Sequence, residues 1–254
     1  MGIRFSELRS PQIGAAAEAG AVVILPVGQT EEHGPHLPVN TDATIAVRVC
    51  EEAARELEGS PPCYVLDPIC YGYSQKALSA WPGVFRLPQE TVIATLTHIL
   101  KSLVGMGFRK IVIASTHGHH DGVVRVAARA LADECGVGPG VVFPSALAAD
   151  VLEGQGKAGW GGSCHAGEFE TSVMLHLAPE LVDMSAAVPD DRLALRFPYS
   201  SSQAFVSTWT TQQSVSGAYG DPTVATAELG KLLFEKMATE TARFVRYYHG
   251  IKQT

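Results

Sequence analysis

Short apolar runs alternate along this chain with longer segments that have one apolar face. Residues 21–27 (AVVILPV) and Lys110–Ser115 (KIVIAS) are largely apolar and rich in β-branched side chains. Such runs are typical of parallel strands that helices cover on both faces. Weaker patterns of the same kind occur at residues 64–69 and 141–143. We therefore predict a central, mostly parallel sheet.

Apolar residues recur at helical spacing between these runs. The stripe in residues 42–57 consists of Ile45, Val49, Ala53 and Leu57. Similar patterns predict helices over residues 88–106, 121–135, 167–177 and 223–248. This alternation indicates an α/β fold in which helices enclose a parallel sheet. Residues 189–220 show no clear period, and the glycine-rich residues 154–162 are interpreted as a flexible loop.

The composition is that of one folded domain. The chain has 254 residues, 46% of them hydrophobic and 18% charged, so we expect a single domain over residues 1–254.

The formal net charge is -7 and no basic run occurs, which argues against nucleic acid as a partner. The five cysteines are scattered without a C-x-x-C pair, so we expect free thiols and a cytoplasmic location. No apolar stretch reaches the roughly 20 residues that span a bilayer, so no membrane partner is expected.

Carboxylate and imidazole side chains are concentrated just after the first predicted strand. Glu31 and His33 lie two residues apart, and Asp42 stands at the start of the next predicted helix. A divalent cation is the usual reason for such groups to be held together. Asp42 alone could be a helix N-cap, but beside Glu31 and His33 we interpret it as a metal ligand. For His36, we favour a structural role, or a contact with a metal ligand, over direct binding to the metal.

A second cluster follows the predicted strand at residues 110–115. His117 comes directly after this strand, and His119 and His120 lie close behind it. A single histidine here could be hydrogen-bonded and structural. Adjacent side chains point in different directions, so we expect at most one of His119 and His120 to join His117. Because ligands of parallel sheets bind beyond the carboxyl ends of strands, this cluster can meet the first one there.

A third cluster contains His165 and Glu168. If a helix begins near residue 166, Glu168 lies in its first turn, where the helix dipole by itself favours a carboxylate. Glu170 could pair with an arginine on the surface. Spacing alone leaves these roles open.

Several strings in the chain resemble the creatininase (creatinine amidohydrolase) family. The most specific is residues 31–38 (EEHGPHLP) with Asp42 downstream. Supporting strings occur at residues 25–28 (LPVG), 71–74 (YGYS), 82–83 (PG), 107–110 (GFRK), 117–118 (HG) and 165–172 (HAGEFETS). The resemblance extends from about residue 20 to about residue 240.

The resemblance implies a three-layer α/β/α sandwich with a mostly parallel sheet, and a homo-oligomer that is often a hexamer. It also implies two divalent metal ions, for which Zn and Mn are the first candidates and Fe(II) is possible. The implied ligands are Glu31, His33, Asp42 and His117, with Asp42 bridging the ions.

The fifth ligand differs within the resembled family. We expect it to be Glu168, which would then belong to the catalytic centre, with His119 as the alternative. His165 is expected to pass a proton to the leaving group, a role that suits an imidazole near neutral pH.

The surroundings of these ligands depart from the resembled family. Its usual N-G-H-G-G-N reads STHGHH at residues 115–120, and its usual F-P-G-T reads WPGV at residues 81–84. Retained ligands in changed surroundings indicate the same chemistry on a different substrate, so creatinine itself is not expected. The side chains expected to shape the substrate pocket are Ser74, Lys76, Trp81, His119, His120 and Trp160.

These observations leave three functional hypotheses. The leading one is a metal-dependent hydrolase that uses a metal-activated water to cleave a cyclic or linear amide in a small polar molecule, at a C–N bond other than a peptide bond. The second is a hydrolase that opens an oxidised cyclic polyol at a C–C bond beside a ketone, for which the polar residues 119–121 are suitable. The third is a non-catalytic, metal-stabilised binding protein, which would need closed metal coordination.

Overall fold

The centre of the protein is a parallel sheet, as the apolar runs predict. The computed structural model describes residues 2–159, 162, 164–190 and 214–252. Within these residues the sheet has four strands in the order β2-β1-β3-β4. All three neighbouring pairs are parallel. The strands are β1 (Val22–Val27), β2 (Cys63–Val65), β3 (Lys110–Ser115) and β4 (Gly140–Val142).

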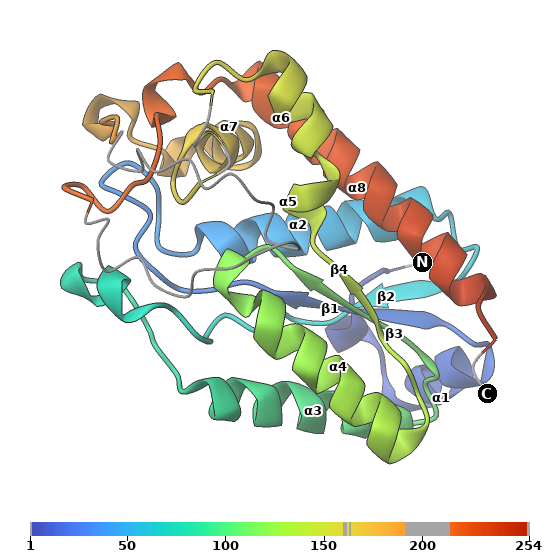
Figure 1. The fold of residues 1–254 in the computed structure, drawn as a ribbon. Helices are drawn as coiled ribbons and strands as arrows, with labels where there is room; N and C mark the ends of the chain where they lie inside the picture. Colours follow the sequence, from blue (N-terminus) through green and yellow to red (C-terminus); the bar gives the residue numbers. More distant parts are fainter. Residues whose placement is uncertain (1, 160–161, 163, 191–213, 253–254) are drawn as a thin grey trace.

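Helices cover both faces of this sheet, which gives three layers (Figure 1). Alternate strand residues point to opposite faces because the side-chain period of a strand is two. Val23 and Leu25 join the core beneath α1 (Ser10–Glu18), α3 (Gln89–Gly105) and α4 (Asp121–Cys135). Val22 and Ile24 join the core beneath α2 (Thr41–Glu56) and α8 (Ala227–Gly250). The predicted α/β sandwich is confirmed.

A further core lies beyond the carboxyl edge of the sheet. There α7 (Glu168–Leu177) packs against α8 and α2 through buried apolar side chains. Phe169, Val173 and Met174 supply the α7 side of this contact. This packing brings the start of α7, and the residues just before it, over the ends of the strands (Figure 1).

Several elements differ from their predicted bounds. The C-terminal helix begins at Ala227, after Thr226, whose side chain accepts a hydrogen bond from the Leu229 N–H as an N-cap. Helices α1, α5 (Pro144–Leu147) and α6 (Ala149–Gln155) were not predicted, because they are short and carry few buried residues. Gly154 lies within α6, so the glycine-rich stretch is not wholly a loop. The short 3-10 helices are Phe5–Glu7, Lys76–Ala80 (η2), Gly118–His120, Pro179–Leu181, Met184–Ala186 and Pro222–Val224.

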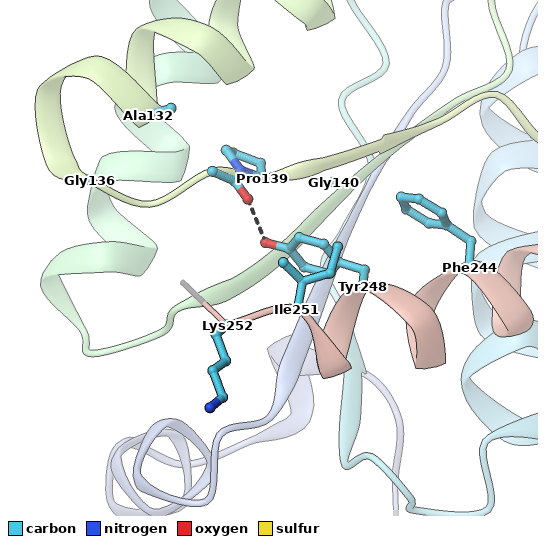
Figure 2. Close-up of a pocket in the computed structure, with 9 residues that line it drawn as sticks. Ala132, Gly136, Pro139, Gly140, Phe244, Tyr248, Ile251 and Lys252 are labelled. Atoms are coloured by element: carbon cyan, nitrogen blue, oxygen red, sulfur yellow. Dashed lines mark hydrogen bonds between the residues drawn. The ribbon is translucent and has the colours of Figure 1, made fainter. Parts of the chain in front are cut away.

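A cavity of about 570 Å³ opens at the amino end of β4, away from the carboxyl edge of the sheet (Figure 2). It lies between the last turn of α8 and the segment that enters β4, and the Tyr248 hydroxyl donates to Gly138 O across it at 2.8 Å. Its walls hold few charged groups, and none of the clustered carboxylates and imidazoles lines it. No helix in the described part of the chain is long and apolar enough to cross a membrane.

The contact between α7 and α8 generates a prediction about stability. A Cβ added at Gly230 would lie 1.8 Å from Ser172 O, so no side chain fits between the helices at this point. We expect Gly230→Ala to lower the free energy of unfolding by about 1–3 kcal/mol, as overpacking does. Chemical denaturation measures this change.

The matched control is Gly14→Ala in α1, where an added Cβ meets nothing within 4 Å. This substitution is expected to be neutral or to stabilise by about 0.5–1 kcal/mol. Equal effects of the two substitutions would contradict the close approach at Gly230.

Candidate metal centre

The first two ligand clusters meet because β1 and β3 are neighbours. Val27 at the end of β1 pairs with Ser115 at the end of β3. The chain leaves both strands at the same edge, so the segments carrying Glu31 and His117 emerge side by side. His117 Nδ1 lies 3.3 Å from Glu31 Oε1. The predicted convergence at the carboxyl edge of the sheet is therefore present in the structure.

Asp42 is fixed at the same place by a close backbone contact. A Cβ at Gly28 would lie 2.4 Å from the Ala43 Cα and 2.8 Å from the Asp42 carbonyl carbon. The Thr116 hydroxyl also donates to Asp42 O at 2.8 Å. The start of α2 is thereby attached to the ends of both central strands, and the Asp42 carboxylate, only 2% exposed, lies beside His117.

Three histidines share one mode of attachment. His33 Nδ1 lies 3.1 Å from Glu31 O, His117 Nε2 lies 3.1 Å from Tyr73 O, and His165 Nε2 lies 2.7 Å from Glu32 O. A ring N–H donated to a carbonyl leaves the other ring nitrogen as an acceptor when the ring is neutral. In each case that second nitrogen is directed at carboxylates of the same cluster.

The two oxygens of Asp42 serve two different sides of this cluster. Oδ2 lies 2.9 Å from His117 Nδ1, and Oδ1 lies 3.6 Å from His33 Nε2. Glu170 Oε2 lies 3.7 Å from the same His33 nitrogen. Asp42 therefore stands between an imidazole that faces Glu31 and an imidazole that faces Glu170.

Three sets of side chains in the described residues have ligand atoms close enough to hold a metal ion. Within each set these atoms lie within 4.8 Å of one another. The sets are Glu31, His117 and His119; His33, Asp42 and Glu170; and Glu31, His33 and His165. His119 therefore joins His117, while His120 is absent from all three sets, as expected for adjacent residues that point in different directions.

Glu168, our expected fifth ligand, lies outside these sets. Its carboxylate accepts hydrogen bonds from the backbone N–H groups of Lys157 and Ala158 at 2.8–2.9 Å. It also stands against Gly156, where an added Cβ would lie 3.1 Å from Glu168 Oε2. Glu168 thus holds the glycine-rich segment before α7, and the carboxylate that lies close to His33 and Asp42 is that of Glu170.

Glu170 is the cluster residue that the sequence did not reveal. Ala166 adopts a left-handed conformation with φ 52°, and its N–H donates to Glu170 Oε2 at 2.6 Å. This turn brings Glu170 back toward His33, whereas Glu168 points to the other side. The available signal was the presence of two carboxylates in the first turn of one helix, and spacing could not choose between them.

The residues expected around the substrate occupy different surroundings. Ser74 is fully buried and donates to Glu31 Oε2 at 2.5 Å, so it contacts a candidate ligand directly. His120 is also buried, and its Nε2 accepts the Tyr73 N–H at 3.0 Å. Lys76 is exposed at the start of η2.

Trp81 directly follows η2 and is half-buried. Trp160 lies outside the described residues. The roles of Lys76, Trp81 and Trp160 in substrate binding stay predictions.

The carboxylates dominate the electrostatics of the cluster. Burial lowers the pKa of His33, but Asp42, Glu170 and Glu31 more than offset this and raise it to about 10. Burial likewise opposes protonation of His117, whose pKa is raised to about 9 by Glu31 and Asp42. Burial and the His117 charge lower the pKa of His119 to about 3. The cluster therefore attracts positive charge at its centre, while His119 remains a neutral imidazole.

The donor set fits divalent metal ions. Glu31 Oε1 and His33 Nε2 are buried without a hydrogen-bond partner among the described residues. Buried polar atoms are normally satisfied, and Glu31 and His33 belong to one set of side chains whose ligand atoms lie within 4.8 Å of one another. Carboxylate oxygens and imidazole nitrogens suit zinc, manganese or iron(II). Carbonyl groups that orient metal-binding imidazoles are also common around protein metal sites.

Comparison with known proteins gives the wider context of this cluster. The creatinine amidohydrolase (creatininase) family matches residues 6–245. The chain belongs to the creatininase family. The resemblance of its sequence strings is thereby confirmed, and the protein is a hydrolase of this family.

Its relatives act on different substrates. The chain is 31% identical over 242 residues to a mycofactocin precursor peptide peptidase of Mycobacterium ulcerans, covering 90% of this chain and 86% of the relative. It is 29% identical over 192 residues to a 3-dehydro-scyllo-inosose hydrolase of Thermotoga maritima, covering 74% and 60%. A solved structure of creatininase with Mn superposes with a TM-score of 0.84 at 26% identity, covering 99% and 100%. Solved creatininase structures also include a Zn–Zn type.

The charge balance of the cluster predicts how the metal-free protein responds to pH. The pKa values of His33 and His117 are raised from 6.5 to about 10 and about 9. The folded state therefore binds more protons than the unfolded state above pH 6.5, and stability falls as pH rises through this range. We expect the thermal midpoint of chelator-treated protein to decrease from about pH 6.5 toward pH 10.

His33→Asn serves as the comparison, because it removes one of the groups whose pKa is raised. Its midpoint should depend less steeply on pH over the same range. A wild-type midpoint that is flat or rises with pH would contradict the charge balance described here.

Proposed function

We propose that this protein is a metal-dependent hydrolase that cleaves an amide C–N bond. The observation that supports this most directly is the convergence of Glu31, Asp42 and Glu170 with His33 and His117 in one buried cluster. Such a concentration of unpaired acceptors needs a cation to neutralise it. Two ions match the arrangement, since Asp42 directs one oxygen to each side.

The chain offers a distinct ligand set to each ion. The first would be held by Glu31, His117 and His119, and the second by His33 and Glu170, with Asp42 shared between them. When bound, such ions lower the pKa of a water molecule and polarise a substrate carbonyl. We place Glu168 in neither set, because its carboxylate is not among the groups whose ligand atoms lie within 4.8 Å of one another.

His165 is the proposed proton-transfer group. Its Nε2 is held by Glu32 O at 2.7 Å, and its Nδ1 faces Glu31 Oε1 at 3.5 Å. Burial and the neighbouring His33 charge lower its pKa, but the Glu32 hydrogen bond and the charges of Glu31 and Glu170 raise it overall. An imidazole held in this way beside the reacting groups can carry a proton to a leaving amine.

The substrate class is argued from the surroundings of the cluster and from the relatives. Residues 115–120 and 81–84 differ from the creatininase strings, which argues against creatinine itself. Because a peptide peptidase is similar over 90% of this chain, linear peptide amides become candidates beside small cyclic amides. An oxidised cyclic polyol is the second candidate, favoured by the relative that hydrolyses 3-dehydro-scyllo-inosose.

Elemental analysis combined with a hydrolysis screen tests this function. We expect close to two divalent ions per chain in protein reconstituted with zinc or manganese, and turnover of at least one amide. The panel should contain creatinine, cyclic amides, short peptides and cyclic polyol ketones. Turnover of only the ketones would favour the second candidate, and bound metal without turnover would favour a non-catalytic binding protein.

The two carboxylates at the start of α7 give a matched pair of variants. We expect Glu170→Gln to lose about one equivalent of metal and to lose activity, because it removes a charged oxygen that faces His33. Glu168→Gln should keep both equivalents. Metal content by mass spectrometry after dialysis measures the difference, and loss of metal only in Glu168→Gln would reverse the assignment.

His165→Gln separates proton transfer from metal binding. We expect kcat to fall about 100- to 10,000-fold, the usual contribution of general acid–base catalysis. Metal content should stay at the wild-type level, because His33, Asp42 and Glu170 are intact. Full activity in this variant would exclude His165 from the proton-transfer role.

A further inference from the structure

We propose that Gln29 and Ser74 form a positioning relay that restricts Glu31 to binding a metal ion through one oxygen. Gln29 and Ser74 are separated by 45 positions in sequence, yet Gln29 Nε2 donates to Ser74 Oγ at 2.8 Å. Ser74 Oγ in turn donates to Glu31 Oε2 at 2.5 Å. All three residues are fully buried. This inference rests on the proposed function, because it assumes that Glu31 is a metal ligand.

The two oxygens of Glu31 have different partners. Oε2 accepts the short hydrogen bond from Ser74. Oε1 instead faces the Nδ1 atoms of His117 at 3.3 Å and His165 at 3.5 Å. Oε1 has no hydrogen-bond partner among the described residues. The carboxylate is therefore oriented with one oxygen occupied and the other available to a cation.

The direction of the relay follows from the hydrogen-bonding capacity of each group. An ionised carboxylate can only accept hydrogen bonds, so the single proton of the Ser74 hydroxyl is directed at Glu31. The hydroxyl oxygen is then free to accept a hydrogen bond from Gln29. Ser74 itself is held from its main chain, because Arg86 Nε donates to Ser74 O at 2.9 Å.

The Gln29 amide has one orientation that suits its neighbours. Its NH₂ group donates to Ser74 Oγ and to Phe85 O at 2.5 Å, which uses both amide protons. A flipped amide would place two acceptors, Gln29 Oε1 and Phe85 O, against each other. Gln29 Oε1 has no partner among the described residues. The amide thus keeps a donor directed at Ser74 although its own oxygen is left unsatisfied.

The relay has a consequence for metal binding. Residues that hydrogen-bond to metal ligands typically contribute 10–100-fold to metal affinity. Without Ser74, the Glu31 carboxylate could rotate and present both oxygens, and its position relative to His117 and His119 would be lost. The effect should be confined to the ion held by Glu31, since no hydrogen bond among the described residues joins Ser74 to His33 or Glu170.

The test measures zinc affinity rather than activity. The full chain is stripped of metal and titrated with zinc against a chromogenic chelator. We expect Ser74→Ala to weaken one equivalent about 10–100-fold and to leave the other unchanged. Gln29→Met removes the amide donor but keeps a side chain of similar size. It should weaken binding of the same equivalent of zinc. In Glu170→Gln, where only the Glu31 equivalent remains tight, adding Ser74→Ala should weaken that remaining equivalent.

Two controls distinguish positioning from general damage. Ser102→Ala removes a single hydroxyl–carbonyl hydrogen bond of 2.9 Å on the exposed face of α3 and should bind zinc like the wild type. Ser74→Thr keeps the hydroxyl and should recover most of the affinity lost in Ser74→Ala. Unchanged zinc binding in both Ser74→Ala and Gln29→Met, or equal weakening of both equivalents, would overturn the relay. Failure of the wild-type protein to bind zinc would instead overturn the proposed function and this inference with it.

Discussion

The arrangement of this protein depends on the cost of burying negative charge. Glu31, Asp42 and Glu170 lie in one buried cluster, and carboxylates removed from water are unfavourable unless a positive group compensates them. In the metal-free protein the compensation comes from His33 and His117, whose pKa values are raised accordingly. On the proposed function, divalent cations would compensate the same charge without requiring those imidazoles to be protonated. Protons and metal ions would then compete for the same place.

The main contribution of the backbone to this cluster is to orient its histidine side chains. Three backbone carbonyl groups, those of Glu31, Glu32 and Tyr73, each hold one ring nitrogen of a histidine. These carbonyls belong to the segments that leave β1 and that follow β2, so they are fixed by the strand order of the sheet. Each imidazole is consequently oriented so that its other ring nitrogen faces the carboxylates of the cluster.

The strands and long helices could be predicted because their apolar patterns are strong. Residues 110–115 and 121–135 form a strand and a helix with the expected bounds, since sheet burial and helical periodicity both select them. Short helices such as α5 and α6 could not be predicted because they bury few residues. For the cluster, the string at residues 31–42 was informative because its polar groups immediately follow a buried strand.

The remaining parts of the cluster depended on local backbone geometry. Which of Glu168 and Glu170 joins the cluster depends on the left-handed turn at Ala166. No apolar pattern in the sequence predicts this turn. Ser74 was expected near the substrate because its string resembles the family. Its contact with Glu31 depends on how residues 71–87 pack against residues 29–31, a tertiary feature without a local signal.

The close approach at Gly28 has a consequence for how this protein can diverge. The chain departs from β1 at Gly28 and returns to the same point at Asp42, so the intervening residues form an excursion whose two ends are tied together. Pro35, Val39 and Asn40 lie exposed within it. Replacements at these exposed positions can leave both roots of the loop in register. This short stretch can therefore vary on its surface while Glu31, His33 and Asp42 keep their places.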